Sequence, residues 1–371
     1  MTYSEALTQA FDVIRRTIPK MGADRPAIGR SDFKYARCHD SHWVDGFWSG
    51  QLWLAYAETG DRTFLEAARA QRPYFIQRLD RPETHDHDLG FLYILSLVAD
   101  TKLTGDEVAC RGALRAADSL AGRYNPRGRF IPAWNWRSES DPNRGRIIID
   151  CMENLNLLFW AAEQTSQTCY RDIAVAHAHT TIDTIVRADG STYHSYIFDP
   201  DTGEPLRGET VQGYADESCW SRGQAWGIHG FAMAYCYTGD EQFRATAVRL
   251  AEYALAHLPD DHVPYWDYRL PDDAPHYRDT SAGAITAAGL FLLADVLDDA
   301  SQADRYRAAA CAILDALIAG YALFDHPEAE GLLAQGASHV AEGLADNMLP
   351  YGDYFFLEAL LRAQGRTAFF W

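Results

Sequence analysis

Residues 52–70 read LWLAYAETGDRTFLEAARA, and this stretch decides the fold. An apolar helix ends in a Thr-Gly-Asp turn, and an amphipathic helix follows it at once. Glycine permits the left-handed backbone that closes a helix, and the aspartate after it accepts N–H groups of the next helix. The stretch therefore predicts a helical hairpin in which one helix is buried and the other is half exposed.

The same pattern recurs along the chain, with turns roughly 45–75 residues apart, which is about one helical hairpin per period. It is repeated in TKLTGDEVACRGALRAADSL (101–120), FWAAEQTSQTCYRDIAVAHA (159–178), AYCYTGDEQFRATAVRLAEYA (234–254) and, more weakly, LLADVLDDASQADRYRAAACAILDAL (292–317). No linker rich in Pro, Gly or Ser divides the chain. We therefore expect one domain over residues 1–371.

Twelve helices follow from this repeat, in two sets of six. The amphipathic helices are expected near 4–18, 62–80, 107–122, 169–187, 241–257 and 303–319. The helices that are apolar on most faces are expected near 46–58, 88–103, 150–165, 221–237, 280–296 and 351–364. A helix that is apolar nearly all round must be buried. The alternation predicts an all-α fold, an (α/α)6 barrel of six inner and six outer helices, with short hairpins only near 191–207 and 262–270.

The barrel also predicts where a functional site lies. All inner helices run the same way, so their six N-termini gather at one end. The segments just before them are HWVDGFW (42–48), THDHDLGF (84–91), RGRIIID (144–150), ESCWSRGQAW (217–226), HYRDTSAG (276–283) and MLPYGDY (348–354). The longest loops, 19–45, 123–149, 188–220 and 258–279, open at the same end. Polar and aromatic residues gathered at one mouth predict a pocket there.

The net charge restricts the partners. The chain carries a formal charge of −19, whereas nucleic acids and anionic membranes bind clustered Lys and Arg. The N-terminal segment reads as an amphipathic helix rather than a signal peptide, and no apolar run reaches the roughly 18 residues of a membrane span. Seven scattered cysteines without a C-x-x-C pair are typical of reduced thiols. A cytoplasmic enzyme with a small-molecule substrate is expected, with neither nucleic acid nor membrane as a partner.

The segment THDHD (84–88) admits three interpretations: metal ligation, helix capping or chemistry. His85 and His87 could chelate an ion, but no H-E-x-x-H or Cys/His spacing completes a zinc set. We therefore expect no dedicated metal site here. Capping is the stronger of the first two, because a carboxylate at a helix start accepts N–H groups and suits the helix dipole. The aspartates at expected helix starts are Asp45, Asp88, Asp150, Asp279 and Asp353.

Asp88 and Asp150 differ from the other three. Asp150 follows three isoleucines, an apolar setting that a cap does not need, and Gly90 beside Asp88 lets another group approach closely. On adjacent inner helices the two carboxylates would face each other across the mouth. Paired acids in an aromatic-lined pocket suit acid/base work on a sugar. Burial and a second carboxylate both raise a carboxyl pKa, and we expect Asp150 to be the raised one because its flanks are more apolar.

Other residues near the mouth could bind a ligand or simply support the fold. His42, His194 and His339 are candidates, although an isolated histidine often only makes a structural hydrogen bond. A buried Arg222 needs an anionic partner, which a substrate carboxylate or an internal aspartate would supply. The tryptophans Trp43, Trp134, Trp220 and Trp226 could stack on a sugar or belong to the core.

Seven strings of the chain carry a resemblance. They are WVDGFWSGQLW (43–53), HDLGFLY (87–93), GRIIIDC (145–151), STYHSYIFDP (191–200), WSRGQAWG (220–227), YRDTSA (277–282) and YGDYFFLEALLR (351–362). In these strings, which run in order over essentially the whole chain, it resembles the unsaturated glucuronyl hydrolases, glycoside hydrolase family 88. The resemblance implies the (α/α)6 barrel and no cofactor.

The resemblance also implies a reaction. The substrate is a lyase-generated disaccharide or short oligosaccharide of the glycosaminoglycan type, whose non-reducing end is a Δ4,5-unsaturated uronic acid. A carboxylic acid protonates C4 of this vinyl ether, water adds at C5, and the hemiketal rearranges to release the partner sugar. Asp150 matches the general acid/base of the family, and Asp88 matches the partner carboxylate that would hold it protonated.

The resemblance further implies a set of substrate-binding residues. His194 and Gln212 match residues near the sugar ring, and Arg222 with Trp226 matches the floor that holds the uronate. The remaining matches are aromatic walls and loop or histidine contacts, namely Trp43, Trp134, Trp220, Gly208, Thr210, His87 and His339. Members that favour sulfated fragments carry a serine- and lysine-bearing segment near the C-terminus. Here that region reads LRAQGRTAFFW (361–371), which argues against such a preference.

Three alternatives remain open at this point. An unsaturated rhamnogalacturonyl hydrolase shares the barrel and the hydration chemistry but acts on pectin-derived substrates, and it fits the DGFWSG segment (45–50) less well. A sugar 2-epimerase of the same fold would use histidine pairs, whereas this mouth is richer in aspartate. A non-catalytic sugar-binding barrel would seldom need two unpaired carboxylates together.

Overall fold

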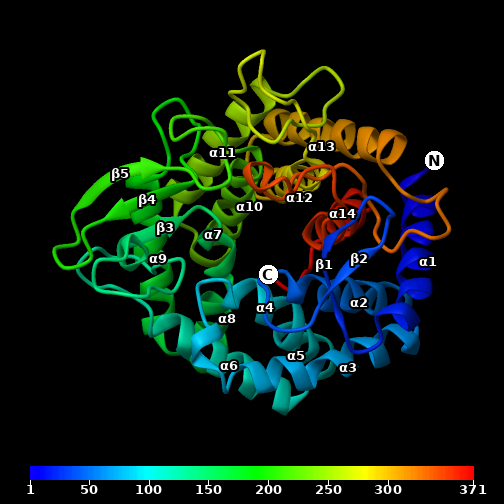
Figure 1. Ribbon diagram of the computed structural model, residues 1–371, viewed down its shortest axis with the longest axis horizontal. Coiled ribbons are helices and arrows are strands. Elements are labelled where there is room, and N and C mark those ends of the chain that lie inside the picture. Colours follow the sequence, from blue (N-terminus) through cyan, green and yellow to red (C-terminus); the bar gives the residue numbers. More distant parts are fainter.

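The helices form two concentric rings (Figure 1), and the computed structural model describes all of residues 1–371. The inner ring consists of α2 (Asp45–Thr59), α4 (Leu89–Tyr93) with α5 (Ala99–Thr104), α7 (Cys151–Asn154) with α8 (Asn156–Thr165), α10 (Ser221–Thr238), α12 (Thr280–Asp295) and α14 (Pro350–Ala363). The outer ring consists of α1 (Tyr3–Met21), α3 (Arg62–Arg78), α6 (Glu107–Ala121), α9 (Thr168–Thr184), α11 (Glu241–Ala256) and α13 (Ala300–Gly320). Because α14 packs back against α2, the ring closes, and the expected (α/α)6 barrel is confirmed.

The turns between paired helices have the expected chemistry. Gly60 ends α2 in the left-handed region at φ 68°, and the Asp61 carboxylate accepts the Thr63 N–H at 2.8 Å to begin α3. In the third copy of the repeat Ser166 takes the left-handed position instead, at φ 58°. The local signal therefore specifies the hairpin even where glycine is missing.

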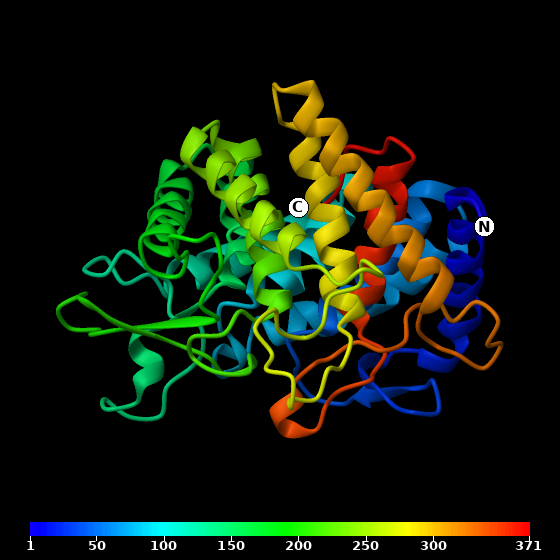
Figure 2. The ribbon, with the colours of Figure 1, turned by 90° about the horizontal axis from the view of Figure 1, so that it is seen from above.

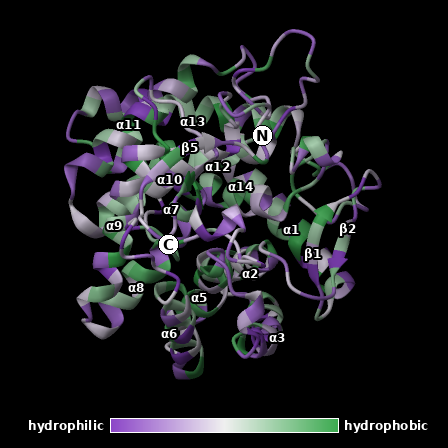
Figure 3. Ribbon diagram, turned by 60° about the vertical axis from the view of Figure 1, so that its left-hand side comes forward, coloured by the Kyte–Doolittle hydropathy of each residue, from purple (hydrophilic) through white to green (hydrophobic).

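Burial separates the two rings. Every residue of α12 from Thr280 to Ala294 is buried, whereas α3 buries only one face, and Figure 3 shows hydrophilic colour along its length. The buried apolar side chains of both rings join in one core cluster of 96 residues. None of the helices combines the length and the apolar character needed to cross a lipid bilayer.

Two of the six inner helices are interrupted. Between α4 and α5 the chain makes a π-helical turn, Ile94–Val98. Between α7 and α8 the helix breaks at Leu155, so that α7 is a single turn of four residues. The other four inner helices are continuous.

The strands are short and lie at one end of the barrel (Figure 2). The expected hairpin near 191–207 is present as β4 (Ser195–Phe198) and β5 (Pro205–Glu209), and β3 (Arg146–Ile148) joins it in the order β3-β4-β5. The expectation for 262–270 is wrong, because only the isolated bridges Trp220–Asp267 and Tyr265–Arg278 form there. A hairpin that the sequence did not indicate joins β1 (Arg25–Gly29) to β2 (Tyr35–Cys38).

The long loops share that end of the barrel with the inner N-termini, as Figure 2 shows. One of them, 321–349 between α13 and α14, was not among the loops expected to be long. It forms a side of the mouth, because the Gly336 and Asn347 backbones pair with each other and Asn347 donates to the Gly29 carbonyl of β1 at 2.8 Å.

Candidate active site

A cavity of about 190 Å³ opens at the mouth. Its lining comes from the starts of three inner helices and from three loops, and consists of Trp43, Asp88, Trp134, Ile148, Asp150, Val211, Gln212 and His339. Two carboxylates and two tryptophans therefore face one space. The site lies where the fold gathers the inner N-termini.

Asp150 occupies the position just before α7, yet it does not cap the helix. Its side chain makes no capping hydrogen bond, and its Oδ2 atom is buried without any partner. Burial raises the pKa of Asp150 to about 7, although the nearby Arg222 guanidinium acts to lower it. A buried, unsatisfied carboxyl group of this pKa can hold a proton near neutral pH and give it to a ligand in the cavity.

Asp88 likewise stands before α4 without a capping bond. Asn154 links it to the other acid, because its Nδ2 atom lies 3.4 Å from Asp88 Oδ1 and 3.2 Å from the Asp150 carbonyl oxygen. Burial raises the pKa of Asp88 well above its usual value, and the Asp86 and Asp150 carboxylates raise it further. We expected only Asp150 to be raised, whereas the two acids form a pair that resists full ionisation.

The other three aspartates have structural partners. Asp279 caps α12 by accepting the Ser281 and Ala282 N–H groups. Asp45 pairs with Arg78 at 3.1 Å, and Asp353 accepts the Tyr35 hydroxyl at 2.6 Å. The capping interpretation thus holds for Asp279 and fails for Asp88 and Asp150.

The histidines of THDHD do not converge on a common point. His85 Nε2 lies 3.1 Å from the Arg78 carbonyl oxygen, whereas His87 Nε2 lies 3.3 Å from Asp88 Oδ1. His87 is fully buried, and burial holds its pKa well below the usual value. No three His, Cys, Asp or Glu side chains of the chain are arranged to hold a metal ion.

His194 presents a single donor beside the acids. Strand pairing of β3 with β4 brings it next to Ile149, whose N–H donates to the His194 carbonyl at 3.0 Å. Its Nδ1 accepts the Val211 and Gln212 N–H groups at 3.0 and 3.2 Å, so the ring proton lies on Nε2, which has no partner. Burial, with Arg222 and Arg146, lowers the pKa of His194 to about 3. The ring is neutral and can donate to a ligand.

Arg222 has an internal partner. It is fully buried, pairs with Asp279 at 2.9 Å, and donates to the Ala337 and Ser338 carbonyls. Its guanidinium also lies 4.3 Å from the centre of the Trp220 ring. The alternative of an internal aspartate for this arginine is therefore realised, and only its Nε atom is without a partner.

The four candidate tryptophans lie in different places. Trp43 lines the cavity and stacks on Tyr351 at a centroid distance of 4.8 Å. Trp134 also lines it, with the Arg146 guanidinium 5.7 Å from its ring centre. Trp220 is 3 % exposed behind His194, and Trp226 is wholly buried, so neither of the two lines the cavity.

The loop candidates divide similarly. Gln212 and His339 line the cavity and join two loops, since Gln212 Nε2 donates to the Ser338 carbonyl and His339 Nε2 donates to the Val211 carbonyl, both at 2.9 Å. Gly208 lies in β5, opposite Tyr196, and the Thr210 hydroxyl accepts the Gly213 N–H. Neither Gly208 nor Thr210 is part of the lining.

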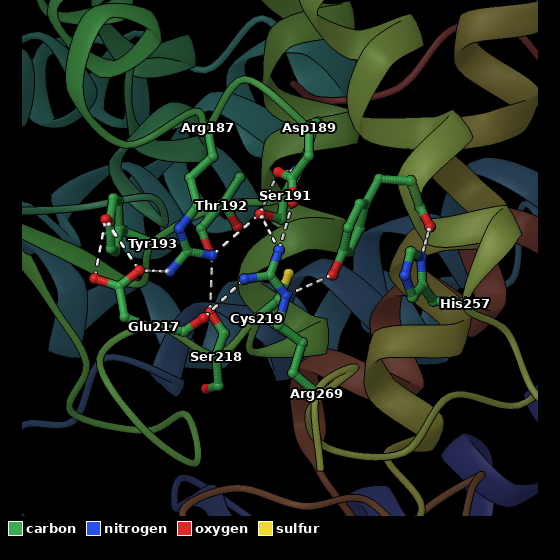
Figure 4. Close-up of polar contacts among 12 residues, drawn as sticks. Arg187, Asp189, Ser191, Thr192, Tyr193, Glu217, Ser218, Cys219, His257 and Arg269 are labelled. Atoms are coloured by element: carbon green, nitrogen blue, oxygen red, sulfur yellow. Dashed lines mark hydrogen bonds and ion pairs between the residues drawn. The ribbon is translucent and has the colours of Figure 1, made fainter. Parts of the chain in front are cut away.

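A network of two arginines supports the loop that carries Gln212 (Figure 4). Arg187 donates to the Ser218 carbonyl at 2.9 Å, and Arg269 donates to the Glu217 carbonyl at 2.9 Å. Both guanidinium groups also donate to the Ser191 hydroxyl, at 3.1 and 3.0 Å. We call these five residues the arginine network; it holds the two ends of the loop 192–217 together.

Sequence reasoning missed several contributors. Val211 and Ile148 line the cavity as apolar residues, and Asn154 joins the two acids. Of these three, only Asn154 carried a signal, since it belongs with Glu153 and Asn156 to a group of polar residues at the start of a helix that was expected to be buried.

Comparison with known proteins finds a matching family model and similar enzymes. The model of Glycosyl Hydrolase Family 88 matches residues 14–337. An unsaturated glucuronyl hydrolase of Bacillus sp. strain GL1 is 43% identical over 100% of this chain and 98% of its own length. The crystal structure of an unsaturated glucuronyl hydrolase from Bacillus sp. GL1, described as responsible for glycosaminoglycan degradation, superposes with a TM-score of 0.95 at 42% identity, covering 100% of this chain and 99% of the other.

A Streptococcus agalactiae enzyme of the same name has been solved as an aspartate-to-asparagine mutant with dGlcA-GalNAc6S bound. It superposes with a TM-score of 0.85 at 34% identity, over 100% of this chain and 93% of the other.

Proposed function

Since the chain belongs to Glycosyl Hydrolase Family 88, we propose that it removes a Δ4,5-unsaturated uronic acid from glycosaminoglycan-type oligosaccharides, with Asp150 as the acid that starts the reaction. One observation carries the role of Asp150. Its carboxyl group is buried, lacks a partner at Oδ2, has a pKa raised to about 7 and faces an aromatic-lined cavity.

The proposed reaction is a hydration. The Asp150 carboxyl gives its proton to C4, and the C4=C5 electron pair forms the new C–H bond. Positive charge develops at C5 and is shared by the ring oxygen. A water molecule bonds to C5 and returns a proton to the Asp150 carboxylate, so the acid is restored. The resulting hemiketal opens and releases the partner sugar, with one water consumed.

Asp88 has the supporting role in this proposal. When Asp150 gives up its proton, the pair must carry a negative charge in a buried site, and a protonated Asp88 makes that step less unfavourable. The burial of both acids and the Asn154 amide between them support this division. Near neutral pH the pair then holds at least one proton, which is the state that the reaction needs.

The cavity walls suggest how the sugar is held. Trp43 and Trp134 offer aromatic faces and Gln212 a polar side chain in the lining. His194 is not one of the lining residues, and we propose that its unpartnered Nε2–H contacts the bound sugar. Arg222 is bonded to Asp279 and two carbonyls. We therefore propose that it favours the uronate through its charge rather than through a two-pronged hydrogen bond.

Isomerisation by histidine acid/base pairs is not supported. Burial lowers the pKa of His194 to about 3, so its ring cannot supply a proton at neutral pH. For the cellular location we propose the cytoplasm, because all seven cysteines are free thiols. Fractionation of cells that express the tagged protein would test this, and recovery of the full-length protein outside the cytoplasmic fraction would contradict it.

The test of the proposed acid is Asp150→Asn, which keeps the shape and removes the proton. Turnover is followed by the ultraviolet absorbance of the alkene conjugated to the carboxylate. We expect the rate to fall by about 10²–10⁴-fold or more. Wild-type turnover in deuterium oxide should place one deuteron at C4. Consumption of the alkene by the variant at the wild-type rate would refute the assignment.

A further inference from the structure

A second group of charges is buried deeper in the barrel than the acids. His229 of α10 lies between two carboxylates, with Nδ1 2.9 Å from Glu153 Oε1 and Nε2 3.2 Å from Glu358 Oε1. Arg362 pairs with Glu358 at 2.7 Å. Glu153, His229 and Glu358 are fully buried, and Arg362 is 6 % exposed. We call these four residues the interior charge cluster.

The cluster connects three inner helices, of which α7 and α10 are neighbours and α10 and α14 are not. Glu153 lies on α7, His229 on α10, and Glu358 and Arg362 on α14, whereas α12 separates α10 from α14 in the ring. The contacts therefore cross the interior of the barrel. A third donor to Glu358, the Trp371 indole N–H, reaches its Oε2 atom at 2.8 Å. Four buried charges cost desolvation energy that an apolar core avoids, so their presence calls for an explanation other than stability.

Their link to the reaction is α7. This single turn begins directly after Asp150 and carries Glu153 three residues later, so the two carboxylates lie on neighbouring positions of one helical face. The helix is interrupted at Leu155, where the Asn156 side chain donates to the Glu153 carbonyl at 2.9 Å. A four-residue helix has little stability of its own. Besides the backbone bonds at its two ends, side-chain contacts therefore help to fix its position.

Two glycines allow α4 and α10 to pack closely against α7. A Cβ atom on Gly90 of α4 would lie 2.2 Å from the Asn154 Cα atom, and one on Gly230 of α10 would lie 2.6 Å from Met152 Cβ. The turn is thus packed tightly from both sides. The one charged contact that anchors it is the pair between Glu153 and His229, the residue just before Gly230.

We propose that Glu153 and His229 are positioning residues of the reaction: their ion pair, braced by Glu358 and Arg362, fixes the turn that carries Asp150 and keeps a negative charge beneath it. This proposal rests on the role of Asp150 given above. It assigns the buried charges to the placement and the protonation of the acid, and not to binding of the sugar.

The electrostatics agree with this arrangement. Asp150 faces Arg222 of α10, Asp88 before α4, Tyr351 of α14, and Cys151 and Glu153 of α7. Of these, Arg222 acts to lower the pKa of Asp150, and Glu153 acts to raise it. Loss of the Glu153 charge should therefore leave Asp150 a stronger acid that loses its proton at lower pH.

His229 itself should be a cation at neutral pH. Burial acts to lower its pKa, but the Glu153 and Glu358 carboxylates outweigh burial and raise it to about 9. For Glu358, burial acts to raise the pKa, and Arg362 together with His229 brings it to about 2. The imidazolium is thus the centre that holds two carboxylates in place.

The deciding experiment is the pH profile of kcat for Glu153→Gln. We expect the alkaline limb, where protonated Asp150 is lost, to move to lower pH by roughly half a unit or more. Glu153→Asp keeps the charge but shortens the reach to His229, so its limb should stay in place while kcat falls between about 10- and 100-fold. Glu330→Gln breaks a partly buried pair with Arg37, remote from α7, and should alter neither quantity.

Each outcome decides the proposal. A folded Glu153→Gln enzyme with the wild-type limb and kcat would overturn it, and so would an equal shift in Glu330→Gln. Should Glu153→Gln fail to fold, the ¹⁵N chemical shifts of His229 in the wild-type protein decide instead. A neutral His229 ring at pH 7 would refute the proposed ion pair with Glu153. If Asp150→Asn keeps full activity, the proposed acid is wrong, which is a different failure from an unmoved limb in Glu153→Gln.

Discussion

The two inner helices that begin with the acids differ from the other four. Asp88 precedes α4, which passes into a π-helical turn, and Asp150 precedes α7, which breaks after four residues. By contrast, α12 is an unbroken helix that begins with Asp279, a capping aspartate. In the proposed mechanism, the two acids that react precede the interrupted helices, whereas the aspartate at the start of the continuous α12 caps its helix.

The contrast shows how the fold keeps the Asp88 and Asp150 carboxylates out of helix capping. A regular helix start consumes its aspartate in capping bonds, as Asp279 demonstrates. In the irregular helices other side chains take over part of the bonding: Ser96 Oγ donates to the Leu92 carbonyl, and the Asn154 amide oxygen accepts the Phe91 N–H. Asp150 Oδ2 is thus left without a partner, and the Asp88 carboxylate keeps only the contacts to Asn154 and His87. Such π-turns are frequent at functional sites.

The most direct test of this difference between the helices replaces, one at a time, two acids with similar pKa values. Burial raises the pKa of both Asp150 and Asp353 to about 7, but Asp353 lies in the continuous α14 and is bonded to Tyr35 and Leu333. Asp150→Asn should lower kcat by at least about 10²–10⁴-fold, whereas Asp353→Asn should change it less than about threefold. Steady-state kinetics at pH 6 measure both. Equal losses would show that burial, and not position, matters.

A second effect concerns packing around the irregular turn. A Cβ on Gly90 would lie 2.2 Å from Asn154 Cα, whereas one on Gly283 of α12 would first meet Pro264 Cδ at 3.4 Å. Gly90→Ala should therefore lower the free energy of unfolding by about 1–3 kcal/mol and reduce kcat as well. Gly283→Ala should be neutral or stabilise by up to about 1 kcal/mol.

Urea unfolding of both glycine variants measures these changes. A Gly90→Ala protein as stable as Gly283→Ala would mean that α7 can move away from α4 at little cost. The close packing inferred around α7, the turn that follows Asp150, would then be wrong.

The same contrast explains how much of the molecule the sequence could predict. The barrel follows from a local pattern, a turn such as Gly60-Asp61 between an apolar and an amphipathic helix, and that pattern recurs. Asp150 stands out because of its three apolar neighbours. The break at Leu155 has no glycine or proline to mark it, and the pairing of Arg222 at the start of α10 with Asp279 at the start of α12 depends on how these two adjacent helices pack. Such contacts depend on tertiary packing that short-range patterns do not encode.

The irregular helices should also make stability depend on pH. The folded pKa of Asp150 is about 7, above the roughly 3.9 of an unfolded aspartate. The folded state therefore binds the proton more tightly, and stability is lost as pH rises from about 4 to about 7. Asp150→Asn removes this loss, so at pH 8 it should be more stable than the wild type by up to about 4 kcal/mol.

Thermal unfolding at pH 4 and pH 8 tests this. The gain should be nearly absent at pH 4, where the carboxyl group is protonated in the folded state and partly so in the unfolded state. Asp353→Asn should gain less at pH 8, because it loses an acceptor for Tyr35 or Leu333. A pH-independent difference between Asp150→Asn and the wild type would exclude a buried, protonated Asp150.

The smallest effect is expected in the arginine network, which supports a wall of the cavity and not the acids. The Arg269 side chain is one-third exposed and bonds to Tyr253, Asp189, Ser191 and the Glu217 carbonyl. Exposed pairs contribute little, so Arg269→Gln should cost about 1 kcal/mol of stability. Because the loop with Gln212 is then held less firmly, KM should rise about two- to threefold with kcat unchanged.

Arg305→Gln, which breaks an exposed pair between α13 and α11, should leave KM unchanged. A fall in kcat for Arg269→Gln would mean that the loop also positions the acids, and the division between irregular helices that react and a mouth that only binds would not hold.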